Sequence, residues 1–172
     1  MFRGVKYMFK LDGIKDMSQE ERLKYMLMLM RGQISSEKND LAKICNVTGI
    51  IMTCVDRLNW AGFYILRDGE LVLGPFQGLP ACNRIAIGKG VCGTAVETKE
   101  VQLVPDVHLF PGHIACDSAS NSELVIPIIK DGNVYGVLDL DSPEKNRFTK
   151  LEEEYFIKLV EILTQNIRWE NI

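Results

Sequence analysis

Apolar residues recur at helical spacing in three stretches of the chain. The first opens at Ser18 and Glu21, whose spacing predicts a capping box, and Gly32 is expected to end it. The second is expected to begin near Ser36 and to bury one stripe of side chains, namely Leu41, Ile44, Val47, Ile51 and Val55. The third opens at Thr149 with another capping box and carries its apolar face on Leu151, Tyr155, Leu159, Leu163 and Ile167.

Between these helices, strand-like segments predict two β-hairpins. Residues 60–66 and 70–73 flank a turn at residues 67–69, which contains Asp and Gly. Residues 123–129 and 134–141 form the second hairpin. The aromatic residues of the first strand are expected in the core; the alternative is that one ring walls a pocket for a small ligand.

Residues 75–121, between the hairpins, are rich in Gly, Pro, Asp, Ser and His. This segment is too long for a simple connection, so we expect functional loops there, with a short helix at 90–98 and a short strand at 101–104. The order of elements predicts an α+β fold: a central antiparallel sheet with helices packed on one face and long pocket-forming loops on the other.

The last strand of the second hairpin places acidic residues on one face. Strand side chains alternate between the two faces of a sheet. The residues expected to face the core are Val134, Leu138 and Leu140, and those expected on the other face are Tyr135, Val137, Asp139 and Asp141. Two neighbouring carboxylates repel each other and need solvent, a cation or a shared proton.

The turn of this hairpin decides which residue joins the two aspartates. A two-residue turn at 131–132 would set Glu123 opposite Leu140 on the core face, where an unpaired carboxylate is costly. A three-residue loop with a left-handed Asn133 sets Glu123 beside Asp141 and matches apolar residues with each other. We favour the three-residue loop, which gathers Glu123, Asp139 and Asp141 on one patch. The alternative is an ordinary solvated sheet face.

Five cysteines are distributed over two kinds of context. Cys45 and Cys54 lie in the second helix and are expected to be small buried residues. Cys82, Cys92 and Cys116 lie in the loop-rich middle. A thiol near a helix N-terminus or a cation has a lowered pKa. That environment is expected for Cys92, at a predicted helix start, and for Cys116, near a histidine; an incidental or structural role is the alternative.

Two cofactor interpretations are not supported by spacing. The potential zinc ligands of the middle segment are Cys82, Cys92, His108, His113 and Cys116, but they lack the close cysteine pairs of structural zinc sites. Residues 88–93 match the pattern G-x-G-x-x-G without the βαβ unit of a dinucleotide site. We therefore expect no metal and no nucleotide, and tight turns at these glycines.

Composition limits the class of protein further. The 172 residues are 47% hydrophobic and 25% charged with a formal net charge of −3, which is typical of one globular domain and gives no basic surface for nucleic acid. No apolar run approaches the roughly 18 residues of a membrane span. The first residues lack the apolar core of an export signal, and the cysteines are too few for a disulfide scaffold. We expect a cytoplasmic protein that binds neither nucleic acid nor membrane.

Several segments together resemble the free methionine-(R)-sulfoxide reductases, which are built on a GAF domain. These segments are residues 59–64, 73–78, 80–82, 88–95, 106–108, 110–120, 122–127 and 136–143. The resemblance implies that residues 1–172 form a single GAF-type domain, with residues 1–35 as an N-terminal helical extension. It also implies an enclosed pocket between sheet and loops, and it suggests a homodimer.

The resemblance also implies roles for particular residues. Cys116 would be the nucleophile, Cys82 the resolving thiol and Cys92 a further redox cysteine. The implied substrate-binding residues are Trp60, Glu123, Asp139 and Asp141.

The implied reaction is reduction of free L-methionine-(R)-sulfoxide without metal or cofactor. The nucleophile attacks sulfur while an acid, with Glu123 the first candidate, protonates the oxygen. The resulting sulfenic acid becomes an intramolecular disulfide, which a thioredoxin-type dithiol reduces. The competing interpretations are a GAF domain that senses a small ligand such as a cyclic nucleotide, and a thiol redox sensor without a substrate.

Overall fold

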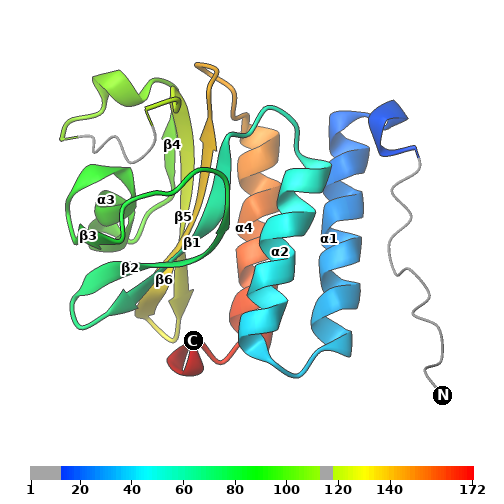
Figure 1. Ribbon diagram of the computed structural model, residues 1–172, viewed down its shortest axis with the longest axis horizontal. Helices are drawn as coiled ribbons and strands as arrows, with labels where there is room; N and C mark the ends of the chain where they lie inside the picture. Colours follow the sequence, from blue (N-terminus) through cyan, green and yellow to red (C-terminus); the bar gives the residue numbers. More distant parts are fainter. Residues whose placement is uncertain (1–12, 113–117) are drawn as a thin grey trace.

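A six-stranded antiparallel sheet forms the centre of the molecule (Figure 1). The computed structural model describes residues 13–112 and 118–172. The strands lie in the order β3-β2-β1-β6-β5-β4. Their bounds are β1 Trp60–Arg67, β2 Glu70–Gln77, β3 Arg84–Ala86, β4 Gln102–Val104, β5 Ser122–Lys130 and β6 Asn133–Ser142.

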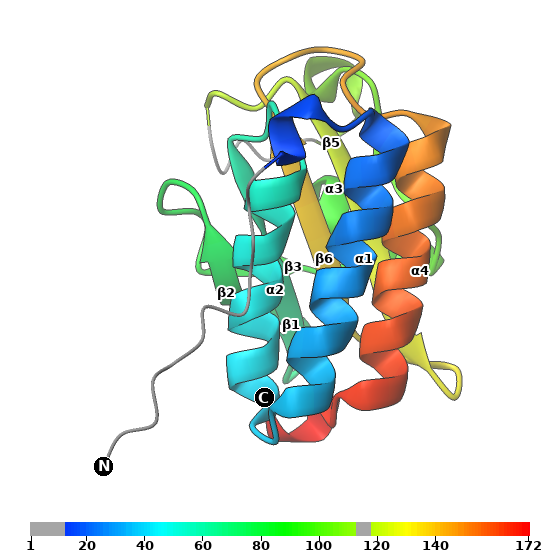
Figure 2. The same cartoon turned by 90° about the vertical axis from the view of Figure 1, so that its right-hand side faces the viewer.

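The helices divide unequally between the two faces of this sheet. Helices α2 (Asp40–Cys54) and α4 (Lys150–Asn166) pack on one face, and α1 (Gln19–Ser36) covers them from outside (Figures 1 and 2). Helix α3 (Gly90–Thr98) lies on the other face with the long loops (Figure 1). Short 3₁₀ turns are η1 Ile14–Asp16, η2 Val107–Leu109 and η3 Trp169–Asn171. The α+β prediction, with helices on one face and loops on the other, is confirmed.

Both predicted capping boxes are present. The Ser18 side chain accepts from the backbone N–H of Glu21, and the Glu21 carboxylate accepts from that of Ser18 at 2.8 Å. Thr149 and Glu152 open α4 in the same way. The prediction that Gly32 ends α1 is wrong, because an exposed glycine costs a helix only about 1 kcal/mol and packing carries α1 on to Ser36.

Helix α2 buries its predicted stripe except at Leu41, and one of its two cysteines is exposed. Ile44, Val47 and Ile51 are fully buried under the sheet, and Cys54 is buried as expected. Leu41 is 52% exposed, because it lies in the first turn and borders a shallow surface groove. Cys45 is also exposed. The expectation of burial is therefore wrong for these two residues.

The second hairpin has the predicted register but a different turn. Glu123 pairs with Asp141, and the apolar residues of β5 and β6 face each other as predicted. The turn has two residues, Asp131 and Gly132, both with positive φ (51° and 79°), as in a type I′ turn. A β-bulge at Tyr135 supplies the extra residue that the three-residue loop was expected to supply.

The bulge reverses the side-chain alternation near the turn. Val134 packs against the core under α3, and Tyr135 packs against the core under α2 and α4, opposite to the prediction. Beyond the bulge the predicted alternation holds: Leu138 and Leu140 belong to the core on the α2 and α4 face, and Val137 to the core under α3. The bulge therefore determines which face each later side chain of β6 occupies, and it brings Asp139 and Asp141 to the loop face.

Gly136, next to the bulge, is expected to tolerate no side chain. Its φ is 155°, and a Cβ there would lie 2.1 Å from the Tyr64 carbonyl oxygen on β1. Gly136→Ala should lower the free energy of unfolding by more than about 1 kcal/mol, measured by urea titration. Gly49→Ala in α2, where a Cβ meets nothing within 4 Å, should instead raise it by about 0.5–1 kcal/mol. Wild-type stability for Gly136→Ala would contradict a rigid bulge.

Candidate functional site

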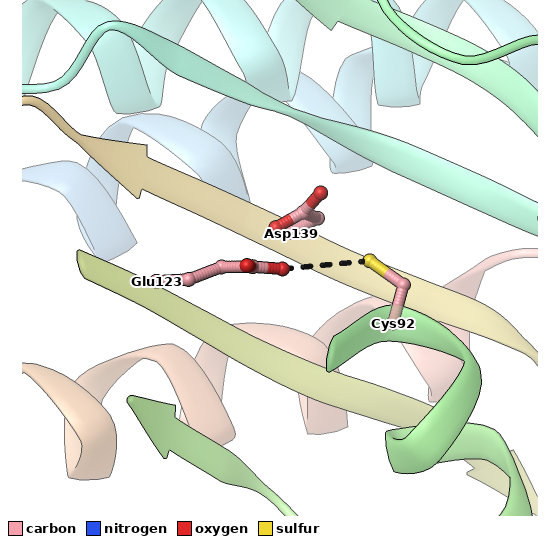
Figure 3. Close-up of side chains that lie close together, drawn as sticks. All are labelled: Cys92, Glu123 and Asp139. Carbon is pink, nitrogen blue, oxygen red and sulfur yellow. Dashed lines mark hydrogen bonds between the residues drawn. The ribbon is translucent and has the colours of Figure 1, made fainter. Parts of the chain in front are cut away.

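Three buried polar side chains converge on the loop face of the sheet. They are Cys92 from α3, Glu123 from β5 and Asp139 from β6 (Figure 3). One ligand atom from each lies within 4.8 Å of the others, and Cys92 Sγ lies 3.9 Å from Glu123 Oε1. Their exposed fractions are 3%, 6% and 6%, so all three are removed from bulk water.

Strand alternation places the two acids and helix packing places the thiol. Asp139 pairs with Val125, two residues along β5 from Glu123, so the two carboxyl groups lie diagonally on one face. Cys92 lies in the first turn of α3. At Gly93 a Cβ would lie 2.4 Å from the Ala86 carbonyl oxygen, so glycine allows α3 to approach β3 closely.

The glycines of the G-x-G-x-x-G segment have two structural roles. Gly88 and Gly90 have positive φ (75° and 60°), which agrees with the tight turns expected there, and Gly93 admits the close packing of α3. Strand β3, which precedes α3, pairs antiparallel with β2, whereas a dinucleotide site needs parallel βαβ strands.

The two carboxyl groups hold protons more tightly than usual. Burial, together with the charges of Asp139 and Asp141, raises the pKa of Glu123 well above its ordinary value. Burial raises the pKa of Asp139 to about 6, and hydrogen bonds with Cys92 and Glu123 oppose that rise. These shifts favour a proton on Glu123 and the negative charge on Asp139.

One oxygen of Asp139 stands out from the rest of the site. Oδ1 is buried and accepts no hydrogen bond within residues 13–112 and 118–172. Buried carboxylate oxygens nearly always have a donor, so a donor on a bound molecule would complete this one.

The thiol of Cys92 is neutral at pH 7. Burial and the charges of Asp139 and Glu123 raise its pKa well above the ordinary value for cysteine. The expectation of a lowered pKa at the helix start is therefore wrong, because burial beside two acids outweighs the helix terminus.

Two aromatic side chains of β1 connect the sheet to the loop that carries Cys82. Trp60 and Tyr64 are buried and stacked, with ring centroids 5.8 Å apart. Trp60 Nε1 donates to the Leu79 carbonyl at 3.2 Å, and the Tyr64 hydroxyl donates to the Cys82 carbonyl at 3.0 Å. Cys82 is disulfide-bonded, and Cys45, Cys54 and Cys92 are free. Sequence reasoning placed Tyr64 in the core without this contact, although its four-residue spacing from Trp60 puts both on one face.

The remaining candidate residues have different surroundings. Asp141 pairs with Glu123 on one side and with Trp60 on the other, and it is partly exposed. His108 is exposed, and its Nε2 lies 3.0 Å from Asn121 Oδ1. Cys116, together with His113, lies outside the described residues.

Within the described part of the chain, Cys92, Glu123 and Asp139 form the one group of three potential metal ligands. Neither Cys82 nor His108 belongs to it, so these members of the zinc interpretation are not brought together. A metal would require a deprotonated thiol. The raised pKa values of Cys92 and Glu123 favour hydrogen bonding by this group instead.

Comparison with known proteins gives a consistent result. The sequence profile described as "GAF domain" matches residues 48–168. Free methionine-R-sulfoxide reductase of Escherichia coli is 50% identical over 127 residues, covering 74% of this chain and 77% of that protein. The Saccharomyces cerevisiae protein of that name is 41% identical over 159 residues, covering 88% of each chain.

A solved structure gives the same relationship in three dimensions. The free methionine-R-sulfoxide reductase of Neisseria meningitidis in complex with its substrate superposes with a TM-score of 0.86 at 34% identity, covering 90% of this chain and 93% of that one. In the described residues, no helix has the length and apolar character needed to cross a membrane.

The raised pKa of Asp139 predicts a pH-dependent effect on stability. In the wild type, Asp139 binds its proton more tightly in the folded state than in the unfolded state. The contribution that this makes to the free energy of unfolding is fully present below about pH 4 and is lost as the pH rises through about 6. Asp139→Asn cannot ionise. Its free energy of unfolding relative to wild type should therefore be higher at about pH 7.5 than at about pH 3.5, measured by urea titration at both pH values. Asp131→Asn, in the exposed turn of the same hairpin, is the control. An Asp139→Asn effect equal at both pH values would contradict the raised pKa.

Proposed function

The chain belongs to the free methionine-R-sulfoxide reductase family, and we propose that it reduces free L-methionine-(R)-sulfoxide to methionine at the expense of thiols. Among the chain's own residues, the main support is the buried pair of acids, Glu123 and Asp139, whose raised pKa values favour a shared proton. This pair lies on the sheet face that also carries the Cys82 loop.

We assign the nucleophile to Cys116 and the resolving thiol to Cys82. The family resemblance supports both roles, and the engagement of Cys82 in a disulfide, with Cys45, Cys54 and Cys92 free, is consistent with them. The Cys116 thiolate attacks the sulfoxide sulfur, the sulfoxide oxygen is protonated, and methionine leaves a sulfenic acid on Cys116. The Cys82 thiol then forms the disulfide and releases water, and a thioredoxin-type dithiol reduces that disulfide by exchange.

Glu123 is the proposed proton donor to the sulfoxide oxygen. A general acid must hold its proton at the working pH, and burial beside like charges gives Glu123 that property. Asp139 and Asp141 are proposed to bind the ammonium group of the substrate, a role that fits the buried Oδ1 of Asp139, which has no donor among the described residues. Methionine within a peptide has no ammonium group, which explains a preference for the free amino acid. Trp60 is proposed to wall the apolar part of the pocket.

Cys92 is proposed as a further redox cysteine that acts after Cys82. Its raised pKa leaves little thiolate at neutral pH, and the thiolate is the form that attacks sulfur. Cys82 therefore precedes Cys92 in our proposed order of reaction with the sulfenic acid. The same acids disfavour a cyclic-nucleotide ligand, because the negative charge of Asp139 would repel a phosphate.

The remaining proposals concern the whole protein. We propose one GAF-type domain over residues 1–172 with residues 1–35 as a helical extension. The packing of α1 against α2 and α4 in one continuous core supports this. A cytoplasmic location, a homodimer, a thioredoxin-type partner and a reaction without metal or cofactor complete the proposal.

Substitution of the two central residues tests the activity. Cys116→Ser should form no methionine, because a hydroxyl is not nucleophilic enough at neutral pH. Glu123→Gln keeps the shape but cannot transfer a proton, so kcat/KM should fall by about 100-fold or more. Methionine is measured by chromatography with dithiothreitol as reductant. Cys45→Ala, at an exposed position of α2, should stay near the wild-type rate. Methionine formation by Cys116→Ser would refute the assigned nucleophile.

Substrate selectivity tests the proposed ammonium site. Wild type should prefer the free R epimer over the S epimer and over an N-acetylated substrate. Asp139→Asn should raise KM for the free amino acid by about ten-fold or more, because it removes a charged hydrogen-bond partner. Its effect on the KM of the N-acetylated form, which has no ammonium group, should be smaller. Equal turnover of both epimers, or of free and acetylated substrate, would overturn the proposed pocket.

A further inference from the structure

The loop that carries Cys82 is attached to the sheet by two side chains of one strand. Trp60 and Tyr64 lie four residues apart on the same face of β1, and each donates a hydrogen bond to a backbone carbonyl of the loop. The acceptors are Leu79 and Cys82 itself, so the second bond ends on the residue that carries the proposed resolving thiol.

Tyr64 is held rigidly in this position. Its side chain is 1% exposed, and its ring stacks on Trp60, which stacks in turn on Phe76 with centroids 5.3 Å apart. Burial and the charges of the neighbouring acids raise the pKa of Tyr64, so the hydroxyl keeps its proton and acts as a donor. The hydroxyl therefore holds the Cys82 carbonyl in place, and the hydrogen bond would break if the loop moved away from this rigid side chain.

We propose that Tyr64 is a positioning residue for Cys82, whose hydroxyl holds the Cys82 backbone where its thiol can reach the oxidised nucleophile. This inference rests on the proposed function. The step concerned joins the Cys82 thiol to the Cys116 sulfenic acid: an S–S bond forms, the S–O bond breaks, and the hydroxide leaves with the thiol proton as water. Such a step is fast only while the two sulfur atoms are held close to their reacting geometry.

Tyr64→Phe separates this role from ordinary packing. The substitution removes the hydroxyl and leaves the buried ring, so the stack on Trp60 is retained. Tyr135→Phe is the matched control. Its hydroxyl also forms one side-chain hydrogen bond, to Glu170 at 3.2 Å, but Tyr135 packs on the opposite face of the sheet.

The experiment follows one turnover of fully reduced protein without added reductant. Samples are quenched at intervals, and the methionine released is quantified. The sulfenic acid is trapped with dimedone, and disulfide formation is followed by mass spectrometry. Tyr64→Phe should release methionine at close to the wild-type rate but form the disulfide about five-fold more slowly or worse, the loss expected for one hydrogen bond. The dimedone adduct should accumulate accordingly, and Tyr135→Phe should match wild type.

A second measurement does not depend on turnover. In the reduced protein, alkylation of Cys82 by iodoacetamide should be several-fold faster in Tyr64→Phe than in wild type, because the loop is released. Unchanged disulfide formation and alkylation in Tyr64→Phe would overturn the positioning role. An equal loss of methionine release and disulfide formation would also overturn it, because Tyr64 would then act on the substrate. Absence of methionine from wild type would instead refute the proposed function.

Discussion

The candidate site depends on the burial of two carboxyl groups side by side in a β-sheet. Glu123 and Asp139 cannot both be ionised so close together in a site without bulk water, and the resulting raised pKa values favour one proton between them. Such a pair costs stability, which the apolar core on the opposite face must offset. That core lies between the same two strands and helices α2 and α4. The larger apolar core therefore lies on one face of the sheet, and the buried acids lie on the other.

Much of this arrangement could be predicted from the sequence because apolar residues have few acceptable positions. Leu140 on β6 must face the helices, and this requirement alone fixed the pairing of Glu123 with Asp141. The means of reaching that register could not be predicted. Asp131 and Gly132 adopt the positive φ values of a two-residue turn, and the compensating bulge at Tyr135 lies beside Gly136, whose backbone closely approaches β1. Such an approach between distant strands leaves no local signal.

In the candidate site, too, features set by neighbouring residues could be predicted, and features set by contacts between distant segments could not. Strand alternation was enough to bring the acids together, and loop composition was enough to single out Cys82 and Cys92. The protonation of Cys92 was predicted in the wrong direction, because it depends on acids that are about thirty to fifty residues away in sequence. The contact between Tyr64 and Cys82 likewise joins a strand to a loop of irregular structure. Helix starts, by contrast, were predicted at Ser18 and Thr149, because capping involves residues three positions apart.

The solvent-exposed thiol of Cys45 has a practical consequence for spectroscopy. It lies on α2, across the sheet from α3 and the buried acids (Figure 1). A fluorophore attached there would report tumbling and association of the protein without entering the catalytic face. Colorimetric thiol titration of the native protein should count this sulfur in both oxidised and reduced samples, so redox stoichiometry is best read from the difference between the two.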